Sequence, residues 1–199
     1  LKCDNWPNDV VDIKCGQEHT LVLTSTLDIY TCGRNNYGQL GRETLESKFS
    51  LTLLKLNLPE IIRIECGYEH SLCIDINNDL YIFGNNDYGQ LGLGDNNNRK
   101  RPYKHPSLSN IIDISSRGCH TFVKTSNNEI YAFGNNKYSQ LGIKTEDENQ
   151  ITPIRVFEDN EDIWFSNINK SKQKSARSIL PRPSNEHDNS PPKKKQKIK

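Results

Sequence analysis

Apolar residues occur in short runs that end at Gly, Asn or Asp. Ile61–Cys66 ends at Gly67, and Leu80–Phe83 ends at Gly84. Between them, His70–Ile74 is followed by Asn-Asn-Asp, residue types that favour turns because they tolerate left-handed backbone. Helical spacing of apolar positions is sustained nowhere, and the runs are too short for helices. The pattern predicts short strands, the last two of which form a hairpin.

The middle run of each group is apolar at consecutive positions. Leu21, Val22 and Leu23 stand together, as do Leu72, Cys73 and Ile74. Consecutive side chains of a strand point to opposite faces, so such a strand needs an apolar cover on both sides. The sequence therefore predicts small sheets that are stacked between similar sheets.

Two motifs recur three times along the chain. Cys15–Thr20 returns as Cys66–Ser71 and, in weaker form, as 116–121. Fourteen residues after each motif His, a Gly opens a run of the form Gly-x-Asn-x-Tyr-x-Gln-Leu-Gly. A period of ~50 residues with several strands per unit is typical of a β-propeller or another stacked array. We expect an all-β propeller with three full blades, around residues 10–60, 61–110 and 111–157.

The repeated residues have structural roles in this interpretation. The His side chains are expected to hold the loops at the blade edges by hydrogen bonds, and the Gln side chains to satisfy buried backbone groups. The Gly residues allow positive φ and close packing. The Tyr and Leu of the second motif are expected to be core residues between blades. The repeated residues are Gly16, His19, Gly33, Gln39, Gly41, Gly67, His70, Gly84, Gln90, Gly92, His120, Gly134, Gln140 and Gly142.

No arrangement of residues favours a metal, a cofactor or covalent catalysis. Cys15 with His19, and Cys66 with His70, have a zinc-like spacing, but pairs repeated with the blade period lie on separate blades, whereas structural zinc needs four converging ligands. The glycines do not precede a helix, as phosphate loops require. We expect no metal, no cofactor and no enzyme activity with covalent chemistry.

Charge divides the chain into two regions. The formal net charge is +1, but residues 166–199 contain ten Lys and Arg against two Asp and Glu, and residues 1–165 contain 16 against 23. We expect a repeat domain over 1–165 and a basic tail over 166–199. No apolar run approaches the ~20 residues of a membrane span, and no secretory leader opens the chain. The six Cys are expected to be reduced thiols.

The start of the chain carries a further expectation. There is no Met, and residue 1 is Leu. We expect a fragment of a longer protein.

The two motifs resemble those of the regulator of chromosome condensation repeat family over roughly residues 10–157. The Trp-Asp dipeptide of WD propellers and the Gly-Gly doublet of kelch propellers are absent. The resemblance implies a ring of about seven blades, of which three are present here. The third unit departs from the pattern, with Arg117 and Ser139 where the other units have Gly.

The resemblance also implies a function. In the family, the position before the motif His helps to engage a small GTPase, which implies Glu18, Glu69 and Cys119 in this chain. The function expected is guanine-nucleotide exchange on a Ran-like GTPase in the nucleus. The alternatives are a chromatin or protein-interaction scaffold without exchange activity, and the accessory propeller of a larger enzyme such as a ubiquitin ligase.

The basic tail ends in a lysine cluster. Prolines and like charges predict an extended, exposed and disordered segment. The cluster resembles a nuclear localisation signal and implies a nuclear-import receptor as a partner, while a nonspecific DNA-binding tail and a solubilising terminus remain as alternatives. The signal residues are Pro192, Lys193, Lys194, Lys195 and Lys197.

Overall fold

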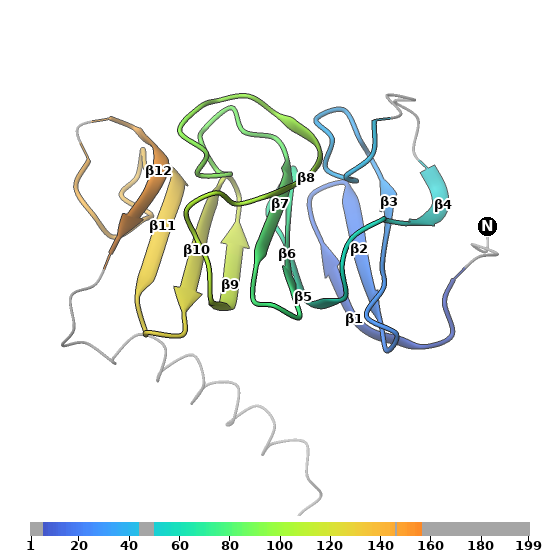
Figure 1. The fold of residues 1–199 in the computed structure, drawn as a ribbon. Coiled ribbons are helices and arrows are strands. Elements are labelled where there is room, and N and C mark those ends of the chain that lie inside the picture. The colour runs from blue at the N-terminus through green and yellow to red at the C-terminus, as the bar shows by residue number, and fades with distance from the viewer. Residues whose placement is uncertain (1–5, 44–49, 146, 157–199) are drawn as a thin grey trace, which may run out of the picture. The chain divides into compact units, whose positions relative to one another are not determined.

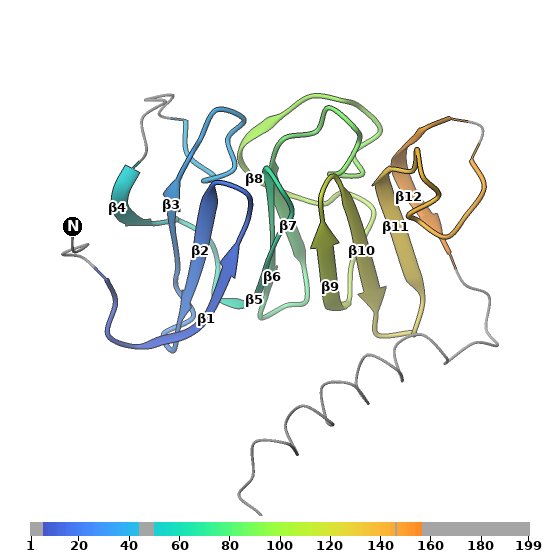
Figure 2. The same ribbon diagram turned by 180° about the vertical axis from the view of Figure 1, so that it is seen from behind.

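The computed structural model describes residues 6–43, 50–145 and 147–156. Within them, three four-stranded antiparallel sheets stand side by side and contain no helix (Figures 1 and 2). The first sheet contains β1 (Val10–Cys15), β2 (His19–Thr24), β3 (Ile29–Gly33) and β4 (Ser50–Lys55). The second contains β5 (Ile61–Cys66), β6 (His70–Asp75), β7 (Leu80–Gly84) and β8 (Arg99–Lys104). The third contains β9 (Ile111–Arg117), β10 (His120–Thr125), β11 (Ile130–Asn135) and β12 (Asn149–Arg155). The prediction of an all-β array with three blades is confirmed.

The strands of each sheet follow one another in chain order and are joined by short turns. The hairpins between the second and third strands turn at Leu27, Asn78 and Asn128, each with φ of 62° or 63°. Asn adopts this left-handed conformation at little cost. The asparagine-rich runs therefore locate two of the three hairpins, and Leu27 occupies the same turn in the first sheet.

The strand register places each motif His beside a motif Gly. His19 pairs with Gly33 and His70 pairs with Gly84, and the third sheet repeats this pairing. A Cβ on Gly33 would lie 2.4 Å from the Glu18 carbonyl oxygen, and φ there is +107°. Only Gly fits at this position, so the two motifs, which are fourteen residues apart, meet at one end of each sheet.

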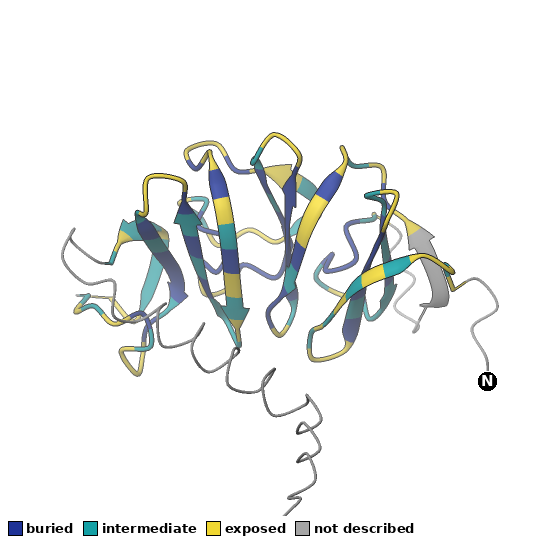
Figure 3. Ribbon diagram, turned by 90° about the horizontal axis from the view of Figure 1, so that it is seen from below, coloured by how far each residue is buried: buried dark blue, intermediate teal, exposed yellow. Residues whose placement is uncertain are grey.

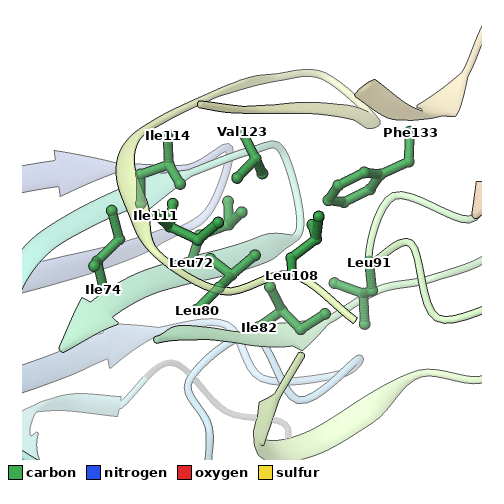
Figure 4. Packing of buried hydrophobic residues seen from close by; sticks show 10 residues of the cluster. All are labelled: Leu72, Ile74, Leu80, Ile82, Leu91, Leu108, Ile111, Ile114, Val123 and Phe133. Atoms are coloured by element: carbon green, nitrogen blue, oxygen red, sulfur yellow. The ribbon is translucent and has the colours of Figure 1, made fainter. Parts of the chain in front are cut away.

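The core lies between the sheets. One cluster joins the first sheet to the second, with Leu21, Leu23 and Ile29 on one side and Ile61 and Ile64 on the other. The other cluster joins the second sheet to the third, as the packing of Leu72, Ile74 and Leu80 against Ile111, Val123 and Phe133 shows (Figure 4). All six residues of β6 are buried, whereas the edge strand β8 has no buried residue (Figure 3). A strand apolar on both faces is thus covered on both faces.

The second motif packs onto the outer strand of the following sheet. A Cβ on Gly38 would lie 2.4 Å from the Cα of Lys100 on β8, and a Cβ on Gly89 would lie 2.6 Å from the Cα of Ile151 on β12. The glycines therefore permit the sheets to approach closely. Ser139, at the equivalent place in the third unit, has φ of 56°.

The motif Leu and Tyr differ in their environment. Leu40, Leu91 and Leu141 are fully buried, as predicted. The prediction that the motif Tyr residues are core is wrong for Tyr88 and Tyr138, which are 43% and 83% exposed, while Tyr37 is half-buried. The physical reason is that the turn buries its Leu between the sheets while its Tyr points out at the sheet end.

By its contacts, the chain divides into two units after Asp159, and all described residues belong to the first. The predicted boundary at residues 165 and 166, the basic tail and its localisation residues lie outside the described residues. Among the residues described, no helix is long and apolar enough to cross a membrane.

Candidate protein-binding face

The loops between the first two strands of each sheet lie at the same end of the array, next to the second motif. They are joined by backbone hydrogen bonds from one unit to the next. The Gln17 N–H donates to the Tyr68 carbonyl at 2.9 Å, and the Tyr68 N–H donates to the Gly118 carbonyl at 2.9 Å. We call this end the loop face. It carries Glu18, Glu69 and Cys119, the three positions that the sequence analysis predicts to bind a GTPase.

The motif histidines lie beneath this face and bridge neighbouring units. His19 Nε2 lies 3.0 Å from Ser71 Oγ, and His70 Nε2 lies 3.0 Å from Thr121 Oγ1. Both rings are buried, and burial lowers the pKa of His19 to about 4 and that of His70 to about 3. The two imidazoles are therefore neutral at physiological pH. Each of them connects its own blade to the next blade, instead of holding a loop at the edge of a single blade.

The third histidine is placed differently. A Cβ on Gly16 would lie 2.1 Å from His19 Cε1, and one on Gly67 would lie 2.0 Å from His70 Cε1. The third unit has Arg117 there, and His120 is only partly buried, with its ring 6.0 Å from that of Phe122 in an edge-on contact. A residue with a Cβ at this position is incompatible with the ring position that His19 and His70 adopt, which agrees with the lower burial of His120.

Two glutamates and an aspartate form an acidic cluster on the loop face. Glu18 forms an ion pair with Arg34, which follows Gly33 at the end of β3. Glu69 accepts a hydrogen bond from Asn85 Nδ2 at 3.5 Å, and the same amide donates to Asp87 at 2.9 Å. We define the acidic cluster as Glu18, Glu69 and Asp87. It presents three carboxylates, of which one is matched by a cation.

The pKa of Glu69 reflects this crowding. Burial raises it above its ordinary value, Glu18 and Asp87 raise it further, and Arg34 opposes them. The shift means that the protein holds an ionised carboxylate at a site where ionisation is unfavourable. Such a residue is a candidate for binding a cationic group, which would relieve the repulsion.

Cys119 lies at the edge of the same cluster. Burial raises the pKa of its thiol, and the charges of Glu69 and Asp87 raise it further. The thiol is therefore protonated at neutral pH, and it contributes no negative charge to the face. The structure thus brings the three candidate positions together, but only two of them carry carboxylates.

The motif glutamines satisfy backbone groups of their own turns. The Oε1 atoms of Gln39, Gln90 and Gln140 accept from the N–H of the motif Tyr two residues earlier, at 2.9–3.0 Å. Gln90 and Gln140 also donate to an Asn side chain at 2.6 Å. The turns on the loop face are therefore fixed by side chains of the motif itself.

The zinc-like pairs do not converge. Cys15 with His19 and Cys66 with His70 belong to different sheets, and Cys15 and Cys66 are both free thiols. Within the described ranges no group of three or more His, Cys, Asp or Glu is placed to hold a metal ion.

Three residues of the loop face were not singled out from the sequence. Arg34 and Asp87 belong to the second motif and reach the glutamates through the His–Gly strand pairing. Tyr68 is half exposed and links the loops through its backbone. The register of the hairpin is the signal that locates Arg34, because it brings residues 16 apart in sequence into contact, as it does for Glu69 and Asn85, the partner of Asp87.

Comparison with known proteins places this arrangement in a family. The model of the regulator of chromosome condensation (RCC1) repeat matches residues 28–74, 77–123 and 127–168. A second model of the same repeat matches residues 10–39 and 61–90.

Several curated proteins resemble the chain over part of its length. The zebrafish (Danio rerio) "Protein RCC2 homolog" is 39% identical over 84 residues, which are 42% of this chain and 17% of that protein. The human "Probable E3 ubiquitin-protein ligase HERC4" is 34% identical over 58% of this chain and 11% of its own length. The human "RCC1-like G exchanging factor-like protein" is 29% identical over 55% of this chain and 25% of its own length. The chain thus spans a quarter or less of each of these relatives.

Solved structures share the fold. Human WBSCR16 superimposes with a TM-score of 0.68 at 26% identity, over 74% of this chain and 39% of that chain. Yeast Prp20 (Saccharomyces cerevisiae), described with its binding properties to Gsp1p and histones, superimposes with a TM-score of 0.68 at 21% identity, over 75% of this chain and 39% of that chain. The second likeness shows the fold alone.

Proposed function

Because the chain belongs to the regulator of chromosome condensation repeat family, we propose that it is a protein-binding propeller segment whose loop face engages a small Ran-like GTPase and promotes release of its guanine nucleotide. The matched repeats cover most of the described residues. The relative named "RCC1-like G exchanging factor-like protein" supports exchange as the activity. The proposal involves no covalent chemistry and no cofactor.

The acidic cluster is the observation that carries this proposal. Glu18, Glu69 and Asp87 lie on one surface, and the pKa of Glu69 is raised by burial and by the other two. A basic segment of a partner would neutralise the cluster, and charge-assisted hydrogen bonds to carboxylates are among the stronger contacts in proteins. Complementary charge would also speed the encounter.

Exchange would follow from differential affinity. A propeller that binds the nucleotide-free GTPase more tightly than the nucleotide-bound form shifts the population towards the free form. Basic groups of the GTPase that hold the phosphates would be drawn to the carboxylates of the acidic cluster, which would weaken the binding of the nucleotide and of its Mg²⁺. Glu18 and Glu69 would provide these contacts, while Cys119 would contribute shape and not charge.

The test is the release of fluorescent GDP from a Ran-like GTPase, together with its binding in nucleotide-free and GDP-loaded forms. Each of Glu18→Gln and Glu69→Gln should weaken binding of the nucleotide-free form by roughly 10- to 150-fold, since a hydrogen bond to a charged group contributes about 1.5–3 kcal/mol. Glu60→Gln is the matched control. This substitution makes the same charge change at an exposed residue. Glu60 precedes β5 and lies at the end of that strand opposite to the loop face.

Two results would contradict the proposal. The first is equal binding of the nucleotide-free and GDP-loaded forms, since a partner without differential affinity cannot drive exchange. The second is an equal effect of the Glu18, Glu69 and Glu60 substitutions, which would mean that overall charge and not the loop face determines binding.

A scaffold without exchange activity is the second candidate. Similarity to the ubiquitin ligase HERC4 favours it, because the matched repeats of that protein make up only 11% of its length. In this case the loop face would bind a partner protein irrespective of nucleotide. Binding without accelerated GDP release identifies this function.

The sequence of the basic tail supports a nuclear location. We propose that Pro192–Lys199 binds a nuclear-import receptor, whose groove would contact the successive lysines. Removing these eight residues should abolish nuclear accumulation of a fluorescent fusion. Unchanged accumulation would overturn this part of the proposal.

A further inference from the structure

The first unit binds a guanidinium group of its own on the loop face. Arg34 forms an ion pair with Glu18, and its Nε and Nη2 atoms donate to the Asn36 side-chain oxygen at 2.9 and 2.8 Å, in the amide orientation that satisfies both groups. The hydrogen bond with Glu18 is the main cause that raises the pKa of Arg34, and Glu69 and Tyr37 contribute. A carboxylate and an amide oxygen, with a tyrosine nearby, thus form a receptor for one guanidinium group.

The second unit repeats this receptor with more negative charge and without the arginine. Where the first unit has Glu18, Arg34, Asn36 and Tyr37, the second has Glu69, Asn85, Asp87 and Tyr88. The amide oxygen of the receptor is therefore replaced by a second carboxylate, and the long arginine by a short amide. The second unit has the acceptors for a guanidinium group but supplies none itself.

The amide of Asn85 has a fixed orientation that shows how close the two carboxylates are. Asn85 is 3% exposed, and its Oδ1 accepts from Gln90 Nε2 at 2.6 Å and from the Asp87 N–H at 2.9 Å. Its Nδ2 therefore points to the carboxylates and donates to Asp87 at 2.9 Å and to Glu69 at 3.5 Å. One neutral N–H₂ group joins the two carboxylates, as the guanidinium group joins its two partners in the first unit.

The charge of these carboxylates is not neutralised within the described part of the chain. Neither Glu69 nor Asp87 forms an ion pair there, and Arg34 acts on Glu69 only from a distance because its own ion pair is with Glu18. A cation that donates to both carboxylates would remove the repulsion between them.

Two exposed tyrosines adjoin the carboxylates in sequence. Tyr68 precedes Glu69 and is 51% exposed, and Tyr88 follows Asp87 and is 43% exposed. The planar guanidinium group stacks on aromatic rings, and arginine does so more often than lysine. The second unit has a described unit on each side, and the Tyr68 backbone is hydrogen-bonded to the loops of both. The exposure of these tyrosines is therefore a property of the loop face and not of the end of the array.

The third unit lacks the receptor. It has Cys119, Asn135 and Lys137 at the positions of Glu69, Asn85 and Asp87. The amide of Asn135 is held in the same way as that of Asn85, since its Oδ1 accepts from Gln140 Nε2 at 2.6 Å and from the Lys137 N–H at 3.3 Å. The chain thus contains a filled receptor, an open one and a unit with the same turn but without carboxylates.

We propose that Glu69 and Asp87 bind the guanidinium group of an arginine side chain of the partner protein, with Tyr68 and Tyr88 as the adjoining aromatic surface. This inference names the chemistry recognised at the acidic cluster and rests on the proposed function for the partner, a Ran-like GTPase. The guanidinium group would donate to both carboxylates, as that of Arg34 donates to Glu18 and Asn36 in the first unit. An ammonium group lacks the planar fork of donors and is bound less well.

The probe is N-acetyl-arginine amide, added to the isotope-labelled full chain and followed in amide NMR spectra. The side-chain N–H₂ signals of Asn85 and the backbone signal of Asp87 should shift in a saturable manner. N-acetyl-lysine amide should bind about two- to tenfold more weakly, because it makes one hydrogen bond fewer.

Variants of the protein locate the site. Asn85→Arg should fill the receptor from within, as Arg34 does in the first unit, and should abolish binding of the arginine probe. Asn135→Arg is the matched control, because it makes the same change in the same turn of a unit without carboxylates, and it should leave binding unchanged. Circular dichroism checks the fold of each variant. Because Asp87 is exposed, Asp87→Asn should weaken binding severalfold and tests the receptor even if Asn85→Arg disturbs the fold.

Tyr88→Leu tests the aromatic surface. It should reduce the preference for the arginine probe over the lysine probe, since the stacked ring is lost while both carboxylates remain. An unchanged preference in this variant would remove the tyrosine from the proposal.

Two results would overturn the inference. They are equal binding of the arginine and lysine probes, and arginine binding that survives both Asn85→Arg and Asp87→Asn. A GTPase that binds through Glu69 to a chain without preference for arginine would also overturn it, but would leave the proposed function intact. Saturable binding of the arginine probe at Asn85, in a chain that does not bind the GTPase, would support the arginine site and contradict the proposed function.

Discussion

Mild acid should destabilise the repeat domain through its buried histidines. The pKa of His19 is lowered to about 4, that of His70 to about 3 and that of His105 to about 4, in each case mainly by burial. In an unfolded chain the value is ~6.5. As the pH falls below this value, the unfolded state binds protons that the folded state does not. The stability that these neutral side chains permit is therefore present above about pH 6.5 and is lost on acidification towards their folded pKa values.

The expected loss is large compared with the stability of a domain. At about pH 5.5, one unit below the unfolded pKa, each histidine costs about 1.3 kcal/mol relative to neutral pH. The three buried histidines together cost about 4 kcal/mol, against a typical stability of about 5–15 kcal/mol. The free energy of unfolding should therefore fall by a substantial fraction over less than two pH units.

The assay is urea unfolding of the full chain, followed by far-ultraviolet circular dichroism at neutral pH and at about pH 5.5. The midpoint should drop at the lower pH. In His70→Gln, which keeps a polar side chain near Thr121, the pH-dependent part of the free energy should shrink by about a third, as expected when one of three titrating groups is removed. His187→Gln, in the predicted extended tail, is the matched control and should leave this part unchanged.

The reasoning is refuted if the midpoint is the same at both pH values. It is also refuted if His70→Gln retains the whole pH dependence, because the proton uptake would then belong to other groups. A lower midpoint for His70→Gln at neutral pH alone has a different meaning. It measures the lost contacts with Thr121 and Ser116, not titration.

Other substitutions test the packing and the loop face. Gly38→Ala should destabilise the domain by about 2 kcal/mol or more in urea unfolding, because φ is +87° and a Cβ would meet the backbone at Lys100. In contrast, Ser139→Gly should be neutral or stabilising in the same measurement, because Ser139 already has a φ of 56°. Leu91→Ala, at a fully buried position, should cost about 2–5 kcal/mol by the same measurement, and a smaller cost would mean that the junction collapses to fill the space. Glu69→Gln should raise the thermal midpoint at neutral pH while it weakens GTPase binding, because burial and like charges raise the pKa of Glu69. A lower thermal midpoint would contradict this account.

The architecture could be predicted from the sequence because each element has a strong local signal. The Asn-rich turns mark two hairpins, and the consecutive apolar residues of β6 require cover on both faces. The spacing of the motif His and Gly also fixes the register, since His70 pairs with Gly84. These features depend on properties of single units, which a repeat displays several times.

The composition of the loop face was less predictable because it depends on contacts between units. The exposure of Tyr88 and Tyr138 depends on how each turn packs onto the following sheet, and a motif cannot reveal this. Asp87 and Arg34 join the acidic cluster only because consecutive loops are hydrogen-bonded to one another. Sequence similarity suggested Glu18 and Glu69, but their electrostatic setting required the structure.

The third unit departs from the other two at four positions of the loop end and of the contact with a following sheet. Arg117 takes the place of a glycine that makes room for the buried imidazole, and His120 is accordingly only partly buried. Ser139 and Lys124 change positions that contact a following sheet in the other units. Cys119 removes the carboxylate that the other loops present at this position. The motif glycine and the loop carboxylate are thus replaced in the same unit in which positions that contact a following sheet also differ. The loop face is therefore acidic where the first two units build it, through Glu18, Glu69 and Asp87, and it presents cationic and aromatic side chains where the third unit builds it, through Arg117, Lys137 and Tyr138.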